Sequence, residues 1–244
     1  LSAAWPRSRQ MFYHRPVAAL ELVSGIQSAL LTRFRQREVR DYLDRESELR
    51  LELNHRVKNI LASVTSIFEM TRRGATTIAG LSEDFRGRLT ALSNIHSAVF
   101  IAGGEEVSLA DVVDSTLAPY RSGGPSGIRV KGPEVLVSSQ AGTTFALCFH
   151  ELATNAIKYG ALSGPEGQIL LEWELSSGPD PDLTITWVET GGPPVVEPSR
   201  TGYGTRYMRS ALAGLFGERP DLVFATDGLR CTIHGPLSRV SLKH

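Results

Sequence analysis

The residues best suited to chemistry lie in one segment, Phe149-His-Glu-Leu-Ala-Thr-Asn-Ala-Ile-Lys-Tyr-Gly. Helical spacing places Glu151, Asn155 and Lys158 on one face of a predicted helix. A carboxylate that acts as a base, an amide oxygen for a hard cation and an ammonium for phosphate are together what a Mg²⁺-triphosphate requires. Small residues between them leave room for a close ligand, although an ordinary polar helix face is the alternative.

Two glycine-containing segments further along the chain could approach a nucleotide closely. Glu189 and Gly191 end a predicted strand, where a carboxylate and a glycine pair permit contact with a base or a phosphate. Gly202, Gly204 and Thr205 open a predicted helix, whose first N–H groups are free to bind phosphate. Either segment alone is weak evidence, because loops commonly contain glycine and proline.

A candidate phosphate acceptor, His55, lies in the middle of an earlier predicted helix and is rotated away from its apolar seam. A neutral imidazole nitrogen is a competent nucleophile near physiological pH. Asn59 lies one turn further on and could fix the ring tautomer through a hydrogen bond. From this segment alone, a surface histidine on a basic helix is the more ordinary interpretation.

The first part of the chain predicts a helical hairpin. From residue 16 to about residue 73, apolar side chains recur in steps of three and four, as along a coiled-coil or bundle seam that Glu46 interrupts. A second helix is predicted from Ser82, as its N-cap, to Phe100. Because neither helix can bury its apolar stripe alone, a second copy of the hairpin is expected to complete a four-helix bundle.

After residue 102 the pattern changes to alternating helices and strands. Helices are predicted at 109–120, 143–159 and 203–216, strands at 128–131, 135–138, 168–175 and 183–188, and a closing hairpin at residues 227–228. Such a mixture predicts an α/β sandwich with helices on one sheet face. The fold class is therefore α+β, with an N-terminal helical hairpin, half of a four-helix bundle, followed by an α/β sandwich.

Composition narrows the class of protein further. The 26 Lys and Arg residues balance 26 Asp and Glu residues, which argues against nucleic acid as a partner. The two cysteines, Cys148 and Cys231, lie in apolar patterns and are expected to be buried, reduced thiols of a cytoplasmic protein. No apolar run approaches a membrane span. The start lacks a methionine, which suggests a piece of a longer chain.

Taken in order, these segments resemble the HWE family of bacterial sensor histidine kinases over about residues 50 to 237. Two of them carry the family's hallmarks, His150 in the N box and the Trp-Val-Glu motif that ends at Glu189. The matching segments are the acceptor box His55-Arg-Val-Lys-Asn-Ile-Leu-Ala, the second-helix segment 85–96, the N box 150–163, Trp187-Val-Glu, Gly202-Tyr-Gly and the terminal segment 228–237.

The resemblance implies two parts, residues 50–103 as the dimerisation and phosphoacceptor hairpin and 104–244 as a Bergerat-type ATP-binding domain. Residues 1–49 lie outside the resemblance and are expected to be a helical connector from an upstream sensor domain. It implies ATP-dependent autophosphorylation of His55 and transfer to an Asp of a response regulator receiver domain. ATP and Mg²⁺ are the implied cofactors, and a homodimer through the hairpin is the implied assembly.

The resemblance also implies roles for the candidate residues of the ATP-binding domain. Asn155 would bind Mg²⁺, Glu151 would act as a base or orient the acceptor, Lys158 would contact phosphate and Tyr159 would lie beside the nucleotide. Glu189 would stand where most histidine kinases place an Asp that binds adenine.

Three points stay open. A short lid, at about residues 192–201, would replace the longer lid of other kinases. His150 is either a structural histidine at a helix start or a residue of the site. A Bergerat-fold ATPase, or a degenerate phosphotransfer or scaffold protein without kinase activity, remains the alternative function.

Overall fold

The structure of the chain is a computed structural model that describes residues 19–101, 105–121, 127–195 and 202–242. The chain forms two compact units that divide between Ala62 and Ser63. The helix α1 (Ala19–Gly74) contributes to both units. Each unit is described by itself below.

The first unit, in its described part, is the helical segment of α1 up to Ala62, as the apolar spacing predicted. Glu46, which interrupts the apolar seam, pairs with Arg50 one turn later at 2.7 Å. The seam itself is exposed to solvent within a single chain. Its exposed members include Leu22, Val23, Ile26, Leu30, Phe34, Val39, Tyr42, Leu49, Leu53 and Val57.

The second unit begins with a helical hairpin made of the last turns of α1 and of α2 (Ile78–Ile101). The predicted N-cap at Ser82 is wrong, because α2 begins four residues earlier. The hydroxyl of Thr77 accepts a hydrogen bond from the Gly80 N–H at 3.1 Å and so satisfies a donor of the first turn. Phe68 and Phe85 close the hairpin edge to face, with ring centroids 5.7 Å apart.

The larger sheet of the second unit has five strands in the order β2-β4-β5-β7-β6. Its strands are β2 (Ile128–Lys131), β4 (Gln168–Leu175), β5 (Asp182–Thr190), β6 (Asp221–Ala225) and β7 (Gly228–Pro236). β2 pairs with β4 in parallel, and the other neighbours are antiparallel. A separate antiparallel pair consists of β1 (Glu106–Ser108) and β3 (Leu136–Ser138). The strand β3 was predicted, but β1 was not, because it lacks a strand-length apolar pattern.

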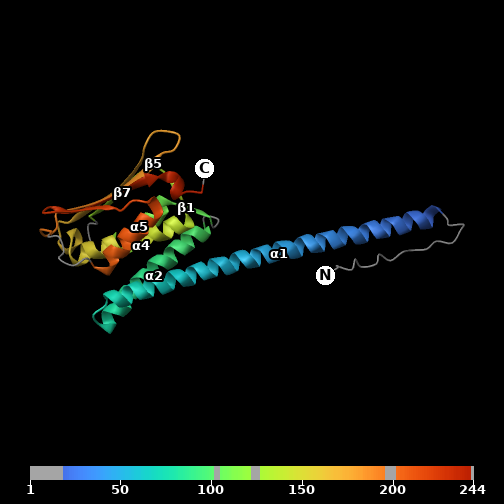
Figure 1. Ribbon diagram of the computed structural model, residues 1–244, viewed down its shortest axis with the longest axis horizontal. Helices are drawn as coiled ribbons and strands as arrows, with labels where there is room; N and C mark the ends of the chain where they lie inside the picture. Colours follow the sequence, from blue (N-terminus) through green and yellow to red (C-terminus); the bar gives the residue numbers. More distant parts are fainter. Residues whose placement is uncertain (1–18, 102–104, 122–126, 196–201, 243–244) are drawn as a thin grey trace. The chain divides into compact units, whose positions relative to one another are not determined.

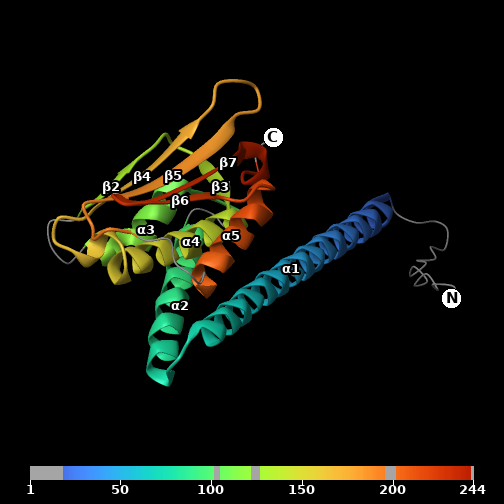
Figure 2. The same cartoon turned by 60° about the vertical axis from the view of Figure 1, so that its left-hand side comes forward.

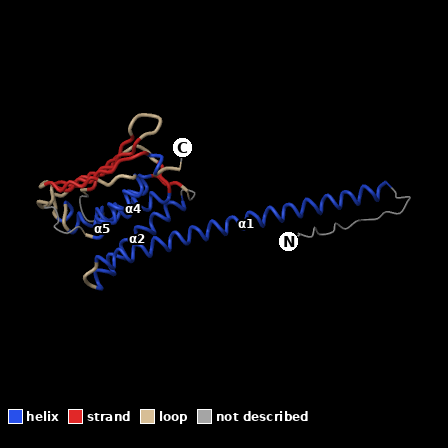
Figure 3. The backbone as a smooth tube through the Cα atoms, viewed as in Figure 1, coloured by secondary structure: helices blue, strands red, loops and turns tan. Residues whose placement is uncertain are grey.

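Three helices cover one face of the larger sheet: α3 (Leu109–Arg121), α4 (Ser139–Lys158) and α5 (Tyr203–Phe216) (Figures 1 and 2). In Figure 3 the strands form one red layer, with α4 and α5 along one side of it. Short 3₁₀ turns follow α4 (η1, Ala161–Ser163) and β7 (η2, Leu237–Arg239). The α+β fold class, with a helical start and an α/β sandwich, is confirmed.

The core lies between this helical layer and the sheet. Alternate side chains of β4 and β5 point into it, so that Leu171, Leu183 and Trp187 are fully buried against Phe145 of α4. The second half of α2 joins the same core, because Ile95 is fully buried and lies beside Gly142 of α4. Tight packing of this kind fixes α4, which carries Glu151, Asn155 and Lys158 of the candidate site.

Both cysteines lie in this core as free thiols, Cys148 in α4 and Cys231 in β7. Burial raises the pKa of Cys148 well above its ordinary value and that of Cys231 to about 12. The prediction of two buried thiols without a disulfide is confirmed. In the part of the chain that the structure describes, no helix combines the length and apolar character that crossing a bilayer requires.

Candidate functional site

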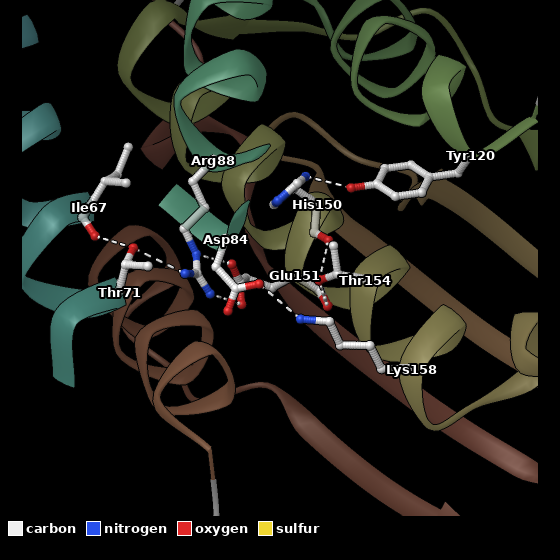
Figure 4. A network of polar contacts seen from close by, with 9 residues as sticks. All are labelled: Ile67, Thr71, Asp84, Arg88, Tyr120, His150, Glu151, Thr154 and Lys158. Atoms are coloured by element: carbon white, nitrogen blue, oxygen red, sulfur yellow. Dashed lines mark hydrogen bonds and ion pairs between the residues drawn. The ribbon is translucent and has the colours of Figure 1, made fainter. Parts of the chain in front are cut away.

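A cavity of about 160 Å³ opens in the second unit where the last turn of α1, the first half of α2, the second half of α4 and the start of α5 meet. Seven of the residues predicted from sequence line it together. They are Glu151, Asn155, Lys158, Tyr159, Gly202, Gly204 and Thr205. Figure 4 shows the network of polar side chains around it.

Helix α4 supplies three polar side chains to the cavity at successive turns. Glu151 is buried, Asn155 is half-buried and Lys158 is exposed at the mouth. Thr154, between them, donates its hydroxyl proton back to the helix carbonyls of His150 and Glu151, at 2.9 and 3.0 Å. Among the described residues, none forms a hydrogen bond with the Asn155 side chain, so its amide oxygen is available to a ligand.

Arg88 of α2 binds the carboxylate of Glu151 with two hydrogen bonds. Its Nε lies 2.6 Å from Oε1 and its Nη2 lies 2.9 Å from Oε2. Its third nitrogen, Nη1, donates to the hydroxyl of Thr71 at 3.0 Å, and Thr71 donates to the Ile67 carbonyl at 2.6 Å. Burial opposes the charge of Arg88, but the hydrogen bond and charge of Glu151 outweigh it, so the pKa of Arg88 is raised. The pair thus ties α4 to both helices of the hairpin (Figure 4).

A second ion pair joins α2 to α4 at the mouth of the cavity. Lys158 Nζ donates to Asp84 Oδ1 at 2.9 Å. Both side chains are partly exposed, at 48% for Lys158 and 36% for Asp84, so solvent screens the pair. Asp84 and Arg88 are one turn apart on α2. Asp84 pairs with Lys158 near the end of α4, and Arg88 pairs with Glu151 two turns earlier in that helix.

His150 also lines the cavity, beneath Gly87 of α2. A Cβ at position 87 would lie 3.0 Å from the Cε1 of His150, so the absence of a side chain lets the imidazole approach α2. The Nδ1 of His150 shares a hydrogen bond of 2.6 Å with the Tyr120 hydroxyl. Burial lowers the pKa of His150 below its ordinary value of 6.5, so the ring is neutral at pH 7.

The start of α5 completes the wall with backbone groups. Gly202 is the N-cap and provides no side-chain hydrogen bond to the first turn, which leaves its N–H groups available to an anion. Gly202 has open space around it, whereas a Cβ on Gly204 would overlap the Oε2 of Glu151. Glu151 therefore excludes a side chain at position 204, whereas no neighbour would meet one at position 202.

Glu189, at the end of β5, does not line the cavity and is 3% exposed. Its Oε1 accepts the indole N–H of Trp187 at 3.0 Å, and its Oε2 accepts the backbone N–H of Ala161 at 2.9 Å. Burial raises the pKa of Glu189, while these two donors act to lower it. A side chain on Gly160 would overlap Oε2. Glu189 thus connects β5 to the turn that directly follows α4.

Gly191 follows Glu189 with a φ of 70°, a left-handed conformation that favours glycine. Like Glu189, it lies outside the cavity. The predicted lid, about residues 192 to 201, falls mostly outside the described residues, which stop at 195 and resume at 202.

The predicted acceptor His55 and its neighbour Asn59 lie on α1 in the first unit, and both side chains are exposed. Exposure satisfies the first requirement of an acceptor that another domain must reach. The tautomer-fixing role of Asn59 stays a prediction.

The donors around the cavity fit a magnesium triphosphate. An amide oxygen suits Mg²⁺, which prefers oxygen ligands and keeps several waters, and backbone N–H groups with a lysine suit phosphate. Among the described residues, no group of three or more His, Cys, Asp or Glu side chains is placed so that it could hold a metal ion by itself.

Sequence reasoning did not assign roles to Asp84, Arg88, Thr71 and Tyr120, which the structure brings to the site. One signal was available for Arg88. It falls on the apolar stripe of α2, in step with Phe85, so a charged residue occupies a position that packing would reserve for an apolar one. A buried arginine needs a partner, and the partner lies on another helix.

The sequence of the chain is similar to those of known proteins. Residues 52–134 match the family model described as HWE histidine kinase. A blue-light-activated histidine kinase of Brucella anthropi is 37% identical over 188 residues, which are 77% of this chain and 38% of that protein. The protein of the same name from Brucella ovis is 34% identical over 188 residues, which are again 77% of this chain and 38% of that protein. The chain thus spans less than half the length of these curated relatives.

Two solved structures share the fold. A blue-light-activated histidine kinase of Erythrobacter litoralis superposes with a TM-score of 0.57 at 19% identity, covering 77% of this chain and 61% of that one. Its histidine kinase domain gives a TM-score of 0.51 at 17% identity, covering 73% of this chain and 95% of that one. These structures show that the fold is shared, while the family match over residues 52–134 and the identity with the Brucella proteins show that the chain belongs to the HWE histidine kinases.

Proposed function

We propose that this chain is the catalytic core of a two-component sensor histidine kinase. It transfers the γ-phosphoryl group of Mg-ATP to His55 and passes that group to an Asp of a response regulator receiver domain. The observation that carries the proposal is the convergence of Asn155, Lys158 and the uncapped start of α5 on one cavity.

Bound Mg-ATP supplies the γ-phosphoryl group, and its metal ion neutralises charge on the phosphates. Asn155 would hold the metal through its amide oxygen, and Lys158 would neutralise phosphate charge. The N–H groups from Gly202 to Thr205 would donate to phosphate. Tyr159, which is 74% exposed at the end of α4, offers an aromatic surface beside the nucleotide.

The exposed imidazole of His55 is the nucleophile. A nitrogen–phosphorus bond forms as the phosphorus–oxygen bond to the ADP leaving group breaks, and the ring proton passes to a base. Glu151 is the candidate base or orienting group, and its carboxylate is held by Arg88 in the structure. Both carboxylate oxygens accept hydrogen bonds from Arg88, so we expect the pair to open before Glu151 takes up a proton.

The assembly belongs to the same proposal. The exposed apolar seam of α1 supports a homodimer, because a helix of this kind buries its stripe against a partner helix. The upstream sensor domain and the receiver domain are inferred from the family. Sedimentation equilibrium at several protein concentrations tests the dimer, and a monomer at all of them contradicts it.

The test of the kinase is incubation with γ-labelled ATP and Mg²⁺, comparing the wild type with His55→Ala. We expect acid-labile, alkali-stable label on the wild type and none on the variant. His234→Ala is the matched control, because it removes an exposed imidazole of β7.

Label on His55→Ala would place the acceptor elsewhere. Release of free phosphate without labelled protein, lost in Asn155→Ala, would instead establish an ATPase. Transfer is tested by adding a receiver domain, which should take the label from the phosphorylated wild type.

A further inference from the structure

We propose that Asp84 is a further affinity-determining residue of the nucleotide site, because its carboxylate occupies Lys158 until a phosphate displaces it. The first half of α2 and the triphosphate then compete for the same cation. This inference rests on the proposed function, since it presumes that nucleotide phosphate binds in the cavity.

The charges on the cavity wall support competition. Its acidic side chains are Asp84 and Glu151, and its basic ones are Arg88 and Lys158. His150 adds no charge at pH 7, because burial lowers its pKa. Each base is within 3 Å of an acid, at 2.6 Å for Arg88 and 2.9 Å for Lys158. Among the described residues that line it, the wall is therefore neutral overall and offers a triphosphate no unpaired cation.

The two ion pairs differ in how easily an anion can open them. The side chains of Arg88 and Glu151 are 11% and 5% exposed, and the guanidinium binds both carboxylate oxygens and Thr71. The Lys158 and Asp84 pair is partly open to solvent and consists of a single hydrogen bond. The Lys158 ammonium is thus the cation that a phosphate can take from its protein partner.

The rest of α2 stays in place when this contact opens. Its second half is held by the buried side chains of Leu92, Ile95 and Val99 in the core of the unit. Only the first half, from Ile78 to Arg88, depends on polar contacts with α4 at the cavity (Figure 4). Phosphate binding to Lys158 therefore removes one of the contacts that hold this segment.

Thermodynamic linkage makes the coupling reciprocal. If ATP weakens the hold of α4 on the first half of α2, then any change that strengthens that hold lowers the affinity for ATP. Nucleotide binding and the hold of α4 on the first half of α2 are therefore thermodynamically coupled.

The test is the dissociation constant of Mg-ATP for Asp84→Asn, measured by isothermal titration calorimetry on the whole chain. An exposed ion pair contributes little, so we expect affinity to rise by about two- to fivefold. The affinity for adenosine, which carries no phosphate, should not change. Glu83→Gln is the matched control, because it removes the same charge from an exposed neighbouring position and should leave both affinities unchanged.

A double-mutant cycle separates competition from simple charge repulsion. In a Lys158→Met background, Asp84→Asn should no longer tighten Mg-ATP binding, because the contested cation is absent. Persistence of the full effect in that background, an equal effect of Glu83→Gln, or an equal gain for adenosine would each overturn the proposal. So would an unchanged Mg-ATP affinity of Asp84→Asn.

The outcomes distinguish this inference from the proposed function. If the wild type binds Mg-ATP and Asp84→Asn binds it no better, the inference fails and the nucleotide site stands. If neither protein binds Mg-ATP, the proposed function fails and the inference fails with it. A tighter complex cannot arise from misfolding, so a gain supports the proposal directly.

Discussion

Gly204, in the first turn of α5, lies against the carboxylate of Glu151 in α4, so closely that a Cβ at position 204 would overlap Oε2. We expect Gly204→Ala to displace Glu151 and strain its pairing with Arg88. Overpacking of this kind costs about 1–3 kcal/mol of unfolding free energy. Urea denaturation measures it.

The control for Gly204→Ala is Gly214→Ala in the same helix. Position 214 has open space around it and lies in a helix, so alanine should leave stability unchanged or raise it by up to about 1 kcal/mol. Equal unfolding free energies for the two variants would contradict the close approach of Gly204 to Glu151.

Arg88 is expected to be the most sensitive charged residue of the hairpin. Arg88→Ala leaves the buried carboxylate of Glu151 without its partner, which costs about 3–5 kcal/mol. Arg86→Ala, an exposed arginine two positions earlier, should change stability by less than about 0.5 kcal/mol. Replacing both partners, in Arg88→Met with Glu151→Leu, should cost less than Arg88→Ala alone.

Comparable losses from Arg88→Ala and Arg86→Ala in urea denaturation would refute the buried pair. The double replacement adds a second check, because it removes the charges without stranding either one.

His150 should make stability depend on pH. Burial lowers its pKa in the folded state, and the nearby Arg88 and Lys158 oppose protonation while Glu151 and Asp84 favour it. The unfolded chain, with an ordinary pKa near 6.5, therefore binds the proton more readily. Stability is fully present above about pH 6.5 and is lost as the pH falls through the lower pKa of the folded state.

Unfolding free energies measured between about pH 7.5 and about pH 5.5 test this sign. His150→Gln should show a shallower loss than the wild type. His96 contributes in the same direction, because burial also lowers its pKa, so some dependence should persist in His150→Gln.

The Trp187 indole and the Ala161 amide both donate to Glu189, which makes the carboxylate hard to replace. Glu189→Gln introduces an NH₂ group that can accept from neither donor, leaving one of them unsatisfied at a cost of about 1–3 kcal/mol. Removing the indole donor as well, in Trp187→Phe with Glu189→Gln, should cost less than the sum of the two single losses, because one unsatisfied group is then absent.

The measurement is a double-mutant cycle of unfolding free energies. Purely additive losses in the two single variants and the double variant would mean that Trp187 and Glu189 do not depend on each other. A coupling of the expected sign would explain why a tryptophan and a glutamate stand two residues apart on one face of β5.

The elements of the second unit were largely predictable, because local patterns determined them. The strand Gln168–Leu175 and the helix Tyr203–Phe216 begin and end where apolar periodicity predicted. Helix starts were less predictable. α4 begins at Ser139, four residues earlier than expected, because Ser138 caps it by accepting from the Ala141 N–H at 3.3 Å. The sequence alone does not distinguish the serine that caps this helix from the serine next to it, because tertiary packing decides where the helix begins.

The candidate site was predictable where one helix or one loop supplied its residues. Asn155 and Lys158 follow from helical spacing alone. Asp84 and Arg88 did not, because their significance depends on α2 lying against α4, a contact between segments more than sixty positions apart. Glu189 was identified in the sequence as a candidate residue, but its burial and its two hydrogen-bond donors are properties of the folded chain that no local pattern indicates.

The two buried thiols provide a built-in reporter of how the second unit opens. Cys148 and Cys231 are the only cysteines of the sequence, and both lie in the core beside α4. Because the thiolate is the reactive form, a raised pKa and a buried position together suppress alkylation in the closed state. The rate of labelling therefore follows the fraction of molecules in which helix and sheet have separated. Motions confined to the first unit, which contains no cysteine, leave no trace in that rate.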